Sequence, residues 1–514
     1  MTLQRSSATL APQRVIPDSV DTEAFLDRIE FRRQSLGESF DAGRRASLGQ
    51  FFTPARAANL IANMVVLPDH GTLRILDPGA GIGSLSAALV ARIVEERPML
   101  DVSICAVEVD AFLTPYLEET LQECREIAAA AGVQLATEIV SNDLVALATG
   151  WTREFFDKFD VVLMNPPYRK LPANSIERKS LAALGVDSPN LYSTFLTIGA
   201  LALVPGGQMV AITPRSFANG PYFGDFRRFL LSHVALDHIH VFESRSTVFG
   251  DSGVLQENVV FSARKWKTPD TVVLSVSRGH EDDVVSRPVP YDEVVRPRDH
   301  QQVIHIPAQK ADTNIATMFA SLPCGIRETG LQVSTGKVVD FRVRKHLLKD
   351  ATDRSVPLIY PGNLKHGRVQ WPLSIRKPQA LAVNDDTQKF LLPNERFVVV
   401  KRFSAKEEKR RVVAAVFEPD DIVASGIAFE NHLNVFHANG RGFDRDFAHG
   451  LCVWLNSTAV DQCFRTFSGH TQVNATDLRS MRYPSQDQLQ RLGAALDGDW
   501  PDQAGIDALV TAYV

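Results

Sequence analysis

Cysteine is scarce in this sequence of 514 residues, which contains only five. The five are scattered, no two of them form a CxxC pair, and their number is odd. This pattern argues against a disulfide framework and against a structural zinc site. We expect reduced cysteines that act as small apolar residues: Cys105, Cys124, Cys324, Cys452 and Cys463.

The sequence also lacks a long hydrophobic run and a strong net charge. No apolar stretch is long enough to span a bilayer, and residues 1–15 have no continuous apolar core of a secretory signal, so we expect a cytoplasmic protein. The net charge of −5 does not indicate a nucleic-acid binder, although local basic runs occur at Lys401–Arg411 and Lys337–His346. Each run could equally be a solvated face.

The first 300 residues follow an α/β rhythm. Thr53 and Pro54 are expected at the N-cap and first position of a helix. From Leu73 onward, seven short apolar runs alternate with helical patterns, which predicts a doubly wound, mostly parallel, seven-stranded sheet covered on both faces. The first four predicted strands are Leu73–Leu76, Val102–Glu108, Gln134–Val140 and Phe159–Met164.

The rhythm weakens after Pro269, and a stretch rich in proline and charge, Arg287–Gln302, is expected to be a junction. Beyond it we predict a mixed α+β domain. The expected division is an N-terminal helical extension at 1–48, the α/β domain at 49–300 and the mixed domain at 301–514.

Acidic residues and glycines follow the first three predicted strands. Glycines let a ligand approach the backbone closely, and a carboxylate after the second strand suits the hydroxyl pair of a ribose. A dehydrogenase site uses a similar turn, but here an acid precedes the first glycine, where it could meet an amine. A ligand with an adenosine end and an amino-acid end fits, so we predict an S-adenosylmethionine site. Its residues are Asp77, Gly79, Gly81, Gly83, Glu108 and, for the adenine amine, Asp143.

A second site follows the fourth predicted strand at Asn165, Pro166, Pro167 and Tyr168. The prolines stiffen the backbone, so that the amide oxygen of Asn165 and the carbonyl of Pro166 form two fixed acceptors. Such a pair would bind both hydrogens of a nucleobase amino group and align its nitrogen with a methyl sulfonium. Tyr168 offers a face for stacking, and a base inside a duplex must be flipped out to reach it. The alternative is a strand-ending turn with two prolines.

These residues resemble the amino-group DNA methyltransferases, and their order resembles the gamma class of adenine-N6 enzymes of type II restriction-modification systems. The motifs are "GQFFTP" at 49–54, "DPGAGIGS" at 77–84 and "NPPY" at 165–168. The resemblance implies that Phe52 and Thr53 help to enclose the cofactor and that Phe249 stacks on the flipped base. It also implies a methyltransferase domain followed by a target-recognition domain, and a monomer acting on double-stranded DNA beside a separate cognate restriction endonuclease.

For the recognition region we predict phosphate contacts and base-edge contacts. The phosphate residues are Arg344, Lys345, Lys401 and Arg402, and the base-edge residues are Gln472 and Asn474. Methyl transfer needs no metal and none is indicated, since His238 and His240 are expected to be structural.

Other functions remain open from the sequence alone. "NPPY" also occurs in methyltransferases of protein glutamine or RNA guanine, and an N4-cytosine enzyme shares the chemistry but usually has serine in place of Asn165. A DNA-binding protein with an inactive methyltransferase fold is a further alternative, which the intact motifs disfavour. So is a fusion with a nuclease, for which no convincing carboxylate cluster is present.

Overall fold

The chain divides into two compact units, Met1–Val303 and Ile304–Val514. The structure is a computed structural model. The residues it describes are 20–39, 52–96, 99–150, 156–182, 185–187, 189–242, 258–277, 284–296, 299, 302–306, 318–319, 321–373, 376–404, 408–467 and 472–514.

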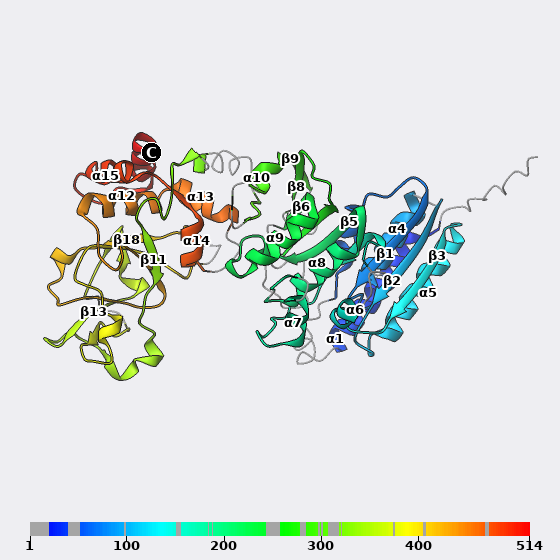
Figure 1. The fold of residues 1–514 in the computed structure, drawn as a ribbon, viewed down its shortest axis with the longest axis horizontal. Helices are drawn as coiled ribbons and strands as arrows, with labels where there is room; N and C mark the ends of the chain where they lie inside the picture. The colour runs from blue at the N-terminus through cyan, green and yellow to red at the C-terminus, as the bar shows by residue number, and fades with distance from the viewer. Residues whose placement is uncertain are drawn as a thin grey trace, which may run out of the picture. The chain divides into compact units, whose positions relative to one another are not determined.

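In the first unit, helices and strands alternate along the chain (Figure 1). The helices are α1 (Thr22–Ser39), α3 (Ala55–Asn63), α4 (Ser84–Glu96), α5 (Thr114–Ala130), α6 (Leu144–Gly150), α7 (Ile176–Ala182), α8 (Leu191–Ala202), α9 (Gly224–His233) and α10 (Tyr291–Val294). The strands are β1 (Gly71–Pro78), β2 (Leu100–Val107), β3 (Gln134–Val140), β4 (Phe159–Met164), β5 (Leu203–Pro214), β6 (Val234–Phe242), β7 (Asn258–Lys265), β8 (Thr271–Ser277) and β9 (Val285–Pro290).

These strands form one mostly parallel sheet in the order β3-β2-β1-β4-β5-β7-β6-β8-β9. The pairs between β3 and β5 are all parallel, as predicted. From β1 the chain builds outward through β2 and β3, then returns to place β4 on the other side of β1. The strand order therefore reverses between β1 and β4, and the crevice at the carboxyl ends of those strands is where such sheets bind ligands.

The described part of the sheet has nine strands, so the prediction of seven is wrong. The extra pair, β8 and β9, extends the sheet beyond β6. Strand β9 occupies part of the segment Arg287–Gln302 that was expected to be a junction. It is mostly exposed and contains Pro288 and Pro290, which an edge strand tolerates because it has no neighbour on one side.

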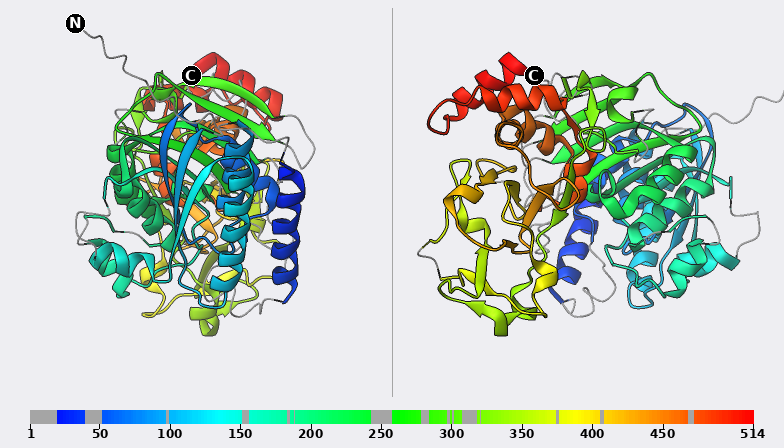
Figure 2. Two further views of the ribbon diagram at one scale, coloured as in Figure 1. Left: turned by 90° about the vertical axis from the view of Figure 1, so that its right-hand side faces the viewer. Right: turned by 60° about the vertical axis from the view of Figure 1, so that its left-hand side comes forward.

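Helices cover both faces of the sheet (Figure 2). The side chains of β4 alternate between these two faces. Val161 and Leu163 join a buried cluster with α1, α3, α4 and α5. Val162 and Met164 point the other way, toward Gly199 of α8. A strand buried on both faces explains why Phe159–Met164 reads as a continuous apolar run.

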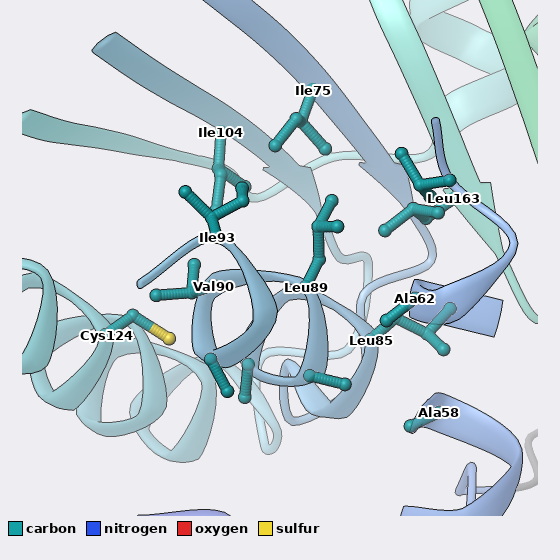
Figure 3. Close-up of a cluster of buried hydrophobic side chains, with 14 of the residues drawn as sticks. Ala58, Ala62, Ile75, Leu85, Leu89, Val90, Ile93, Ile104, Cys124 and Leu163 are labelled. Carbon is teal, nitrogen blue, oxygen red and sulfur yellow. The ribbon is translucent and has the colours of Figure 1, made fainter. Parts of the chain in front are cut away.

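Helix α4 contributes more residues than any other helix to the buried cluster that contains Val161 and Leu163. In Figure 3, Leu89 and Ile93 of α4 point toward Ile75 and Ile104 of the sheet, while Val90 faces Cys124 of α5. Complete burial of a leucine such as Leu89 stabilises the fold by about 1.5–3 kcal/mol. This packing fixes the start of α4, which directly follows the glycine loop.

The helix near residue 54 begins one residue later than predicted. Pro54 occupies the N-cap position of α3, and no side chain caps the helix. Thr53 is therefore outside the helix, and its hydroxyl is used elsewhere, as described below.

The second unit is a mixed α+β structure, as predicted. Its helices are α12 (Arg445–Leu455), α13 (Thr458–Phe467), α14 (Ala475–Ser480), α15 (Gln486–Ala494) and α16 (Gln503–Tyr513). A six-stranded sheet has the order β11 (Gln332–Thr335), β20 (Leu433–His437), β17 (Phe397–Lys401), β18 (Ala414–Phe417), β15 (Arg368–Val369) and β14 (Leu364–Lys365). A four-stranded sheet has the order β12 (Leu347–Leu348), β16 (Ala380–Ala382), β13 (Ser355–Ile359) and β19 (Ala428–Phe429), and β10 (Cys324–Gly325) pairs with β21 (Arg482–Tyr483).

None of the helices in the described part of the chain combines the length and the apolar character needed to cross a bilayer.

Candidate active site

A cavity opens at the carboxyl ends of β1, β2 and β4, where the strand order reverses. Eight of the predicted site residues line it: Phe52, Thr53, Gly79, Gly81, Glu108, Asp143, Asn165 and Pro167. The structure thus brings together the two sites that the sequence predicts separately.

The glycine loop after β1 forms one wall of this cavity. Gly79 and Gly81 have φ angles of 74° and 59°, a region that residues with a side chain rarely adopt. The N–H groups of Gly79 and Ala80 donate to the carbonyl of Val107 at 2.8 and 3.0 Å, which fastens the loop to the end of β2. A Cβ on Gly79 would lie 3.1 Å from the ring of Phe195. The loop therefore presents bare backbone to whatever occupies the cavity.

Gly83 does not line the cavity, and it is needed for close packing between two helices. Its φ is 87°, and a Cβ there would lie 3.0 Å from Thr120 and 3.1 Å from Leu117, both on α5. The third glycine of the motif thus allows α4 and α5 to approach closely.

Glu108 is the buried carboxylate at the end of β2. Its Oε2 accepts a hydrogen bond from the Gly81 N–H and its Oε1 accepts one from the Asp110 N–H, both at 2.8 Å. Burial raises the pKa of Glu108, although these backbone donors favour its charged form. A carboxylate oxygen has more than one lone pair, so the oriented group can still accept from a ligand hydroxyl.

Asp77 does not line the cavity. It is buried, and its Oδ2 accepts a hydrogen bond from the Ser86 hydroxyl at 2.6 Å. Burial, together with the nearby charge of Glu108, raises the pKa of Asp77 to about 7. In this structure the side chain connects the end of β1 to the first turn of α4.

Asp143 lies on the cavity at the start of α6. Its Oδ1 accepts hydrogen bonds from the N–H groups of Val145 and Ala146 at 2.8 and 2.9 Å, which caps the helix. The adjoining Leu144 supplies an apolar wall.

The amide of Asn165 is held by a contact across the cavity. Its Nδ2 donates to the Thr53 hydroxyl oxygen at 3.0 Å. Because the nitrogen of the amide faces Thr53, its oxygen is turned the other way, as an acceptor. Thr53 is buried, which shields this hydrogen bond from water.

The residues after Asn165 pack against β5 and the start of α8. Pro166 is buried, while Pro167 reaches the cavity. The Tyr168 hydroxyl donates to the carbonyl of Ile212 at 3.4 Å, and its ring meets Tyr192 edge-on, with centroids 6.2 Å apart. Tyr168 is not among the residues that line the cavity, so it lies beside the cavity instead of within it.

Several residues of the cavity were not predicted. Arg169 follows the motif directly and forms an ion pair with Glu177 at 3.1 Å. The others are mostly apolar: Ala80, Ile82, Ser84, Leu85, Val107, Val109, Leu113, Asn142, Leu191 and Phe195. The position directly after "NPPY" could have indicated Arg169, and Ala80, Ile82 and Ser84 lie within the "DPGAGIGS" motif, whereas the other residues of this set belong to no motif named above. No cluster of His, Cys, Asp or Glu that could hold a metal occurs among the described residues.

The predicted DNA contacts fall in different parts of the second unit. Arg344 and Lys345 lie in a 3-10 turn before β12, and Lys345 pairs with Asp386 at 3.1 Å. Lys401 ends β17 and pairs with Glu408 at 3.0 Å. Arg402 lies 3.5 Å from Gln472.

The two remaining predicted DNA-contacting residues are Asn474 and Phe249. Asn474 is the N-cap of α14 and forms a capping box with Asp477. Phe249 lies outside the described residues, so its role stays a prediction.

The cavity fits S-adenosylmethionine by the character of its walls. Bare glycine backbone, an oriented carboxylate and a second acid meet apolar side chains, as a ligand with ribose, adenine and amino-acid parts requires. When bound, this cofactor supplies an activated methyl group on a sulfonium.

Known proteins with similar sequences cover nearly the whole chain. Type II methyltransferase M.PstI of Providencia stuartii is 38% identical over 485 residues, covering 93% of this chain and 95% of the relative. Type II methyltransferase M.BsuBI of Bacillus subtilis is 39% identical over 457 residues, covering 87% and 90%. Residues 116–249, which include the Asn165 segment, match the family described as Eco57I restriction-modification methylase.

One solved structure supports the fold. The type IIL restriction-modification enzyme MmeI in complex with DNA superposes with a TM-score of 0.53 at 11% identity, covering 96% of this chain and 74% of that one. With the sheet and cavity described above, these matches define an S-adenosylmethionine-dependent methyltransferase. More particularly, the chain belongs to the type II DNA methyltransferases of restriction-modification systems.

Proposed function

We propose that this protein transfers a methyl group to the exocyclic N6 of an adenine at one specific sequence of duplex DNA. The target adenine is flipped out of the helix, because its amino group cannot be reached inside the stack. Methylation protects host DNA from a separate cognate restriction endonuclease. The protein acts as a monomer.

The observation that carries this proposal is the Asn165 amide held by Thr53 at the cofactor cavity. An adenine amino group has two hydrogens in one plane. The Asn165 Oδ1 and the Pro166 carbonyl are two acceptors for them, and binding both hydrogens directs the nitrogen lone pair toward the methyl group. Fixed acceptors need no reorganisation during the reaction, which is the basis of electrostatic preorganisation.

In this proposal, different residues of the cavity bind the ribose, the adenine and the amino-acid part of the cofactor. Glu108 accepts from the ribose hydroxyls, and Asp143 accepts from the adenine amine through Oδ2. Phe52 and Leu144 pack against the adenine ring, and the backbone of Gly79 and Gly81 lies along the amino-acid part. Asp77 acts indirectly, because its hydrogen bond with Ser86 steadies the glycine loop that lies between the two residues.

Aromatic residues hold the target base in this proposal, and the second unit selects the DNA sequence. Tyr168 and Phe249 contact the flipped adenine. The second unit recognises the DNA sequence through residues that include Arg344, Lys345, Lys401, Arg402, Gln472 and Asn474.

The proposal is tested by incubating the full-length protein with duplex DNA and S-adenosylmethionine labelled in the methyl group, then digesting the DNA to nucleosides. We expect the label in N6-methyladenine. Label in N4-methylcytosine would show that the target base is cytosine instead of adenine. Label found only in protein or RNA would overturn the proposal.

A further inference from the structure

A cluster of polar and aromatic side chains lies at the end of β17 in the second unit. It comprises Arg402, Phe403, His432 and Gln472, and is called the Arg402 cluster below. None of the cofactor chemistry uses it. Its residues come from three segments that are distant in the sequence and meet through their backbones.

Backbone hydrogen bonds fix these three segments to one another. The Arg402 N–H donates to the carbonyl of His432 at 2.8 Å, and the Val473 N–H donates to the carbonyl of Arg402 at 2.7 Å. Phe403 and Gln472 form an isolated antiparallel bridge. The side chains therefore project from a rigid base, which reduces the entropy lost when they bind a partner.

The aromatic part of the cluster faces solvent. Phe403 is 41% exposed, and its ring packs on that of His432 with centroids 4.9 Å apart. The His432 ring is oriented by the buried carboxylate of Glu430, which lies 2.6 Å from Nδ1. A buried acid that orients an exposed ring is an arrangement suited to presenting that ring to a ligand.

The polar part has hydrogen-bonding capacity that the described residues do not use. The Arg402 guanidinium reaches the carbonyl of Asn431 at 3.2 Å and the Gln472 Oε1 only at 3.5 Å. Its Nε is buried and has no partner within the described part of the chain, and the same holds for the Oδ1 atoms of Asn431 and Asn434. Each terminal nitrogen of the guanidinium carries two N–H donors and has one acceptor in these contacts, so Arg402 keeps donors for a further partner.

We infer that the Arg402 cluster reads base pairs of the DNA recognition sequence in the major groove. Arg402 donates to the O6 and N7 of a guanine, with Gln472 holding the guanidinium in the required plane. Phe403 and His432 pack against the neighbouring base, as an apolar surface does against a thymine methyl group. This inference rests on the proposed function, because it assumes that duplex DNA is the substrate.

The test selects bound duplexes from a library with random sequence, using full-length protein, and sequences the bound fraction. For Arg402→Ala we expect discrimination at one base-pair position to fall about 5- to 150-fold, with other positions unchanged. Arg402→Lys keeps the charge but cannot form the planar two-donor contact, so it should lose the same discrimination while retaining overall affinity. Phe403→Ala should relax the position next to it.

Two matched variants serve as controls. Phe341, also in the second unit, is 76% exposed, and Arg445 at the start of α12 pairs only with Asp446 among the interactions seen. Phe341→Ala and Arg445→Ala should leave the selected sequence unchanged. Thermal unfolding of each variant shows whether the second unit remains folded.

Other outcomes overturn the inference. If Arg402→Ala weakens binding equally for all sequences, the arginine contacts phosphate instead of a base. If the Arg402 and Phe403 variants select the wild-type sequence at wild-type affinity, the cluster does not contact DNA. Methyl transfer to the same library is measured separately, so the proposed function can fail or stand independently of the cluster.

Discussion

Replacing Thr53 with valine tests whether the orientation of the Asn165 amide matters for transfer. The substitution keeps the shape of the side chain but removes the oxygen that accepts from Nδ2 at 3.0 Å. Loss of a partner for a little-exposed polar group costs about 1–3 kcal/mol. If this cost falls on the transition state, kcat decreases about fivefold to about 150-fold.

The assay separates transfer from cofactor binding, because Thr53 also lines the cavity. Single-turnover rates report transfer, and calorimetric titration reports the Kd of S-adenosylmethionine. Thr53→Ser restores the hydroxyl and should recover most of the rate, within about threefold of the wild type. A wild-type rate for Thr53→Val, or a loss confined to cofactor affinity, would refute the positioning role.

Three further predictions concern the cofactor loop. Glu108→Gln should raise the Kd of S-adenosylmethionine about tenfold or more, because a charged acceptor for the ribose is lost; an unchanged calorimetric Kd would contradict this. The folded-state pKa of Asp77 is about 7, above its ordinary value near 3.8, so the folded state holds the proton more tightly and its stability falls as pH rises between those values. The unfolding temperature of Asp77→Asn should therefore rise relative to that of the wild type as the pH increases from about 4 to about 7, and parallel profiles would count against the raised pKa of Asp77. Gly83→Ala should lower the free energy of unfolding by about 2–4 kcal/mol, since it combines a positive φ with contacts to α5, whereas Gly132→Ala, at a similar φ in open space, should cost about 1–2 kcal/mol in the same urea titration.

The sequence predicts two strands of the first unit correctly. Gln134–Val140 and Phe159–Met164 match β3 and β4 residue for residue. For β4, which is buried on both faces, the signal is a nearly continuous apolar run, whereas β3 is an edge strand without a fully buried residue. The carboxyl ends of β2, β3 and β4 place Glu108, Asp143 and Asn165 on one rim.

The remaining features depend on contacts between distant residues, which no local pattern encodes. Thr53 and Asn165 are 112 positions apart, so the sequence could suggest that both are functional but not that one holds the other. Strand β9 was missed because an exposed edge strand needs few apolar residues. Gly83 looked like a ligand residue because sequence shows only that a glycine is required, not whether a cofactor or a helix approaches it.

The central claim is that the Asn165 oxygen binds the amino group that receives the methyl group. Asn165→Ala is the most direct test, with single-turnover transfer to duplex DNA and calorimetric cofactor affinity measured on the same preparation. We predict that transfer becomes undetectable while the Kd of S-adenosylmethionine stays within about threefold of the wild type. Transfer at an undiminished rate by the alanine variant would contradict the claim.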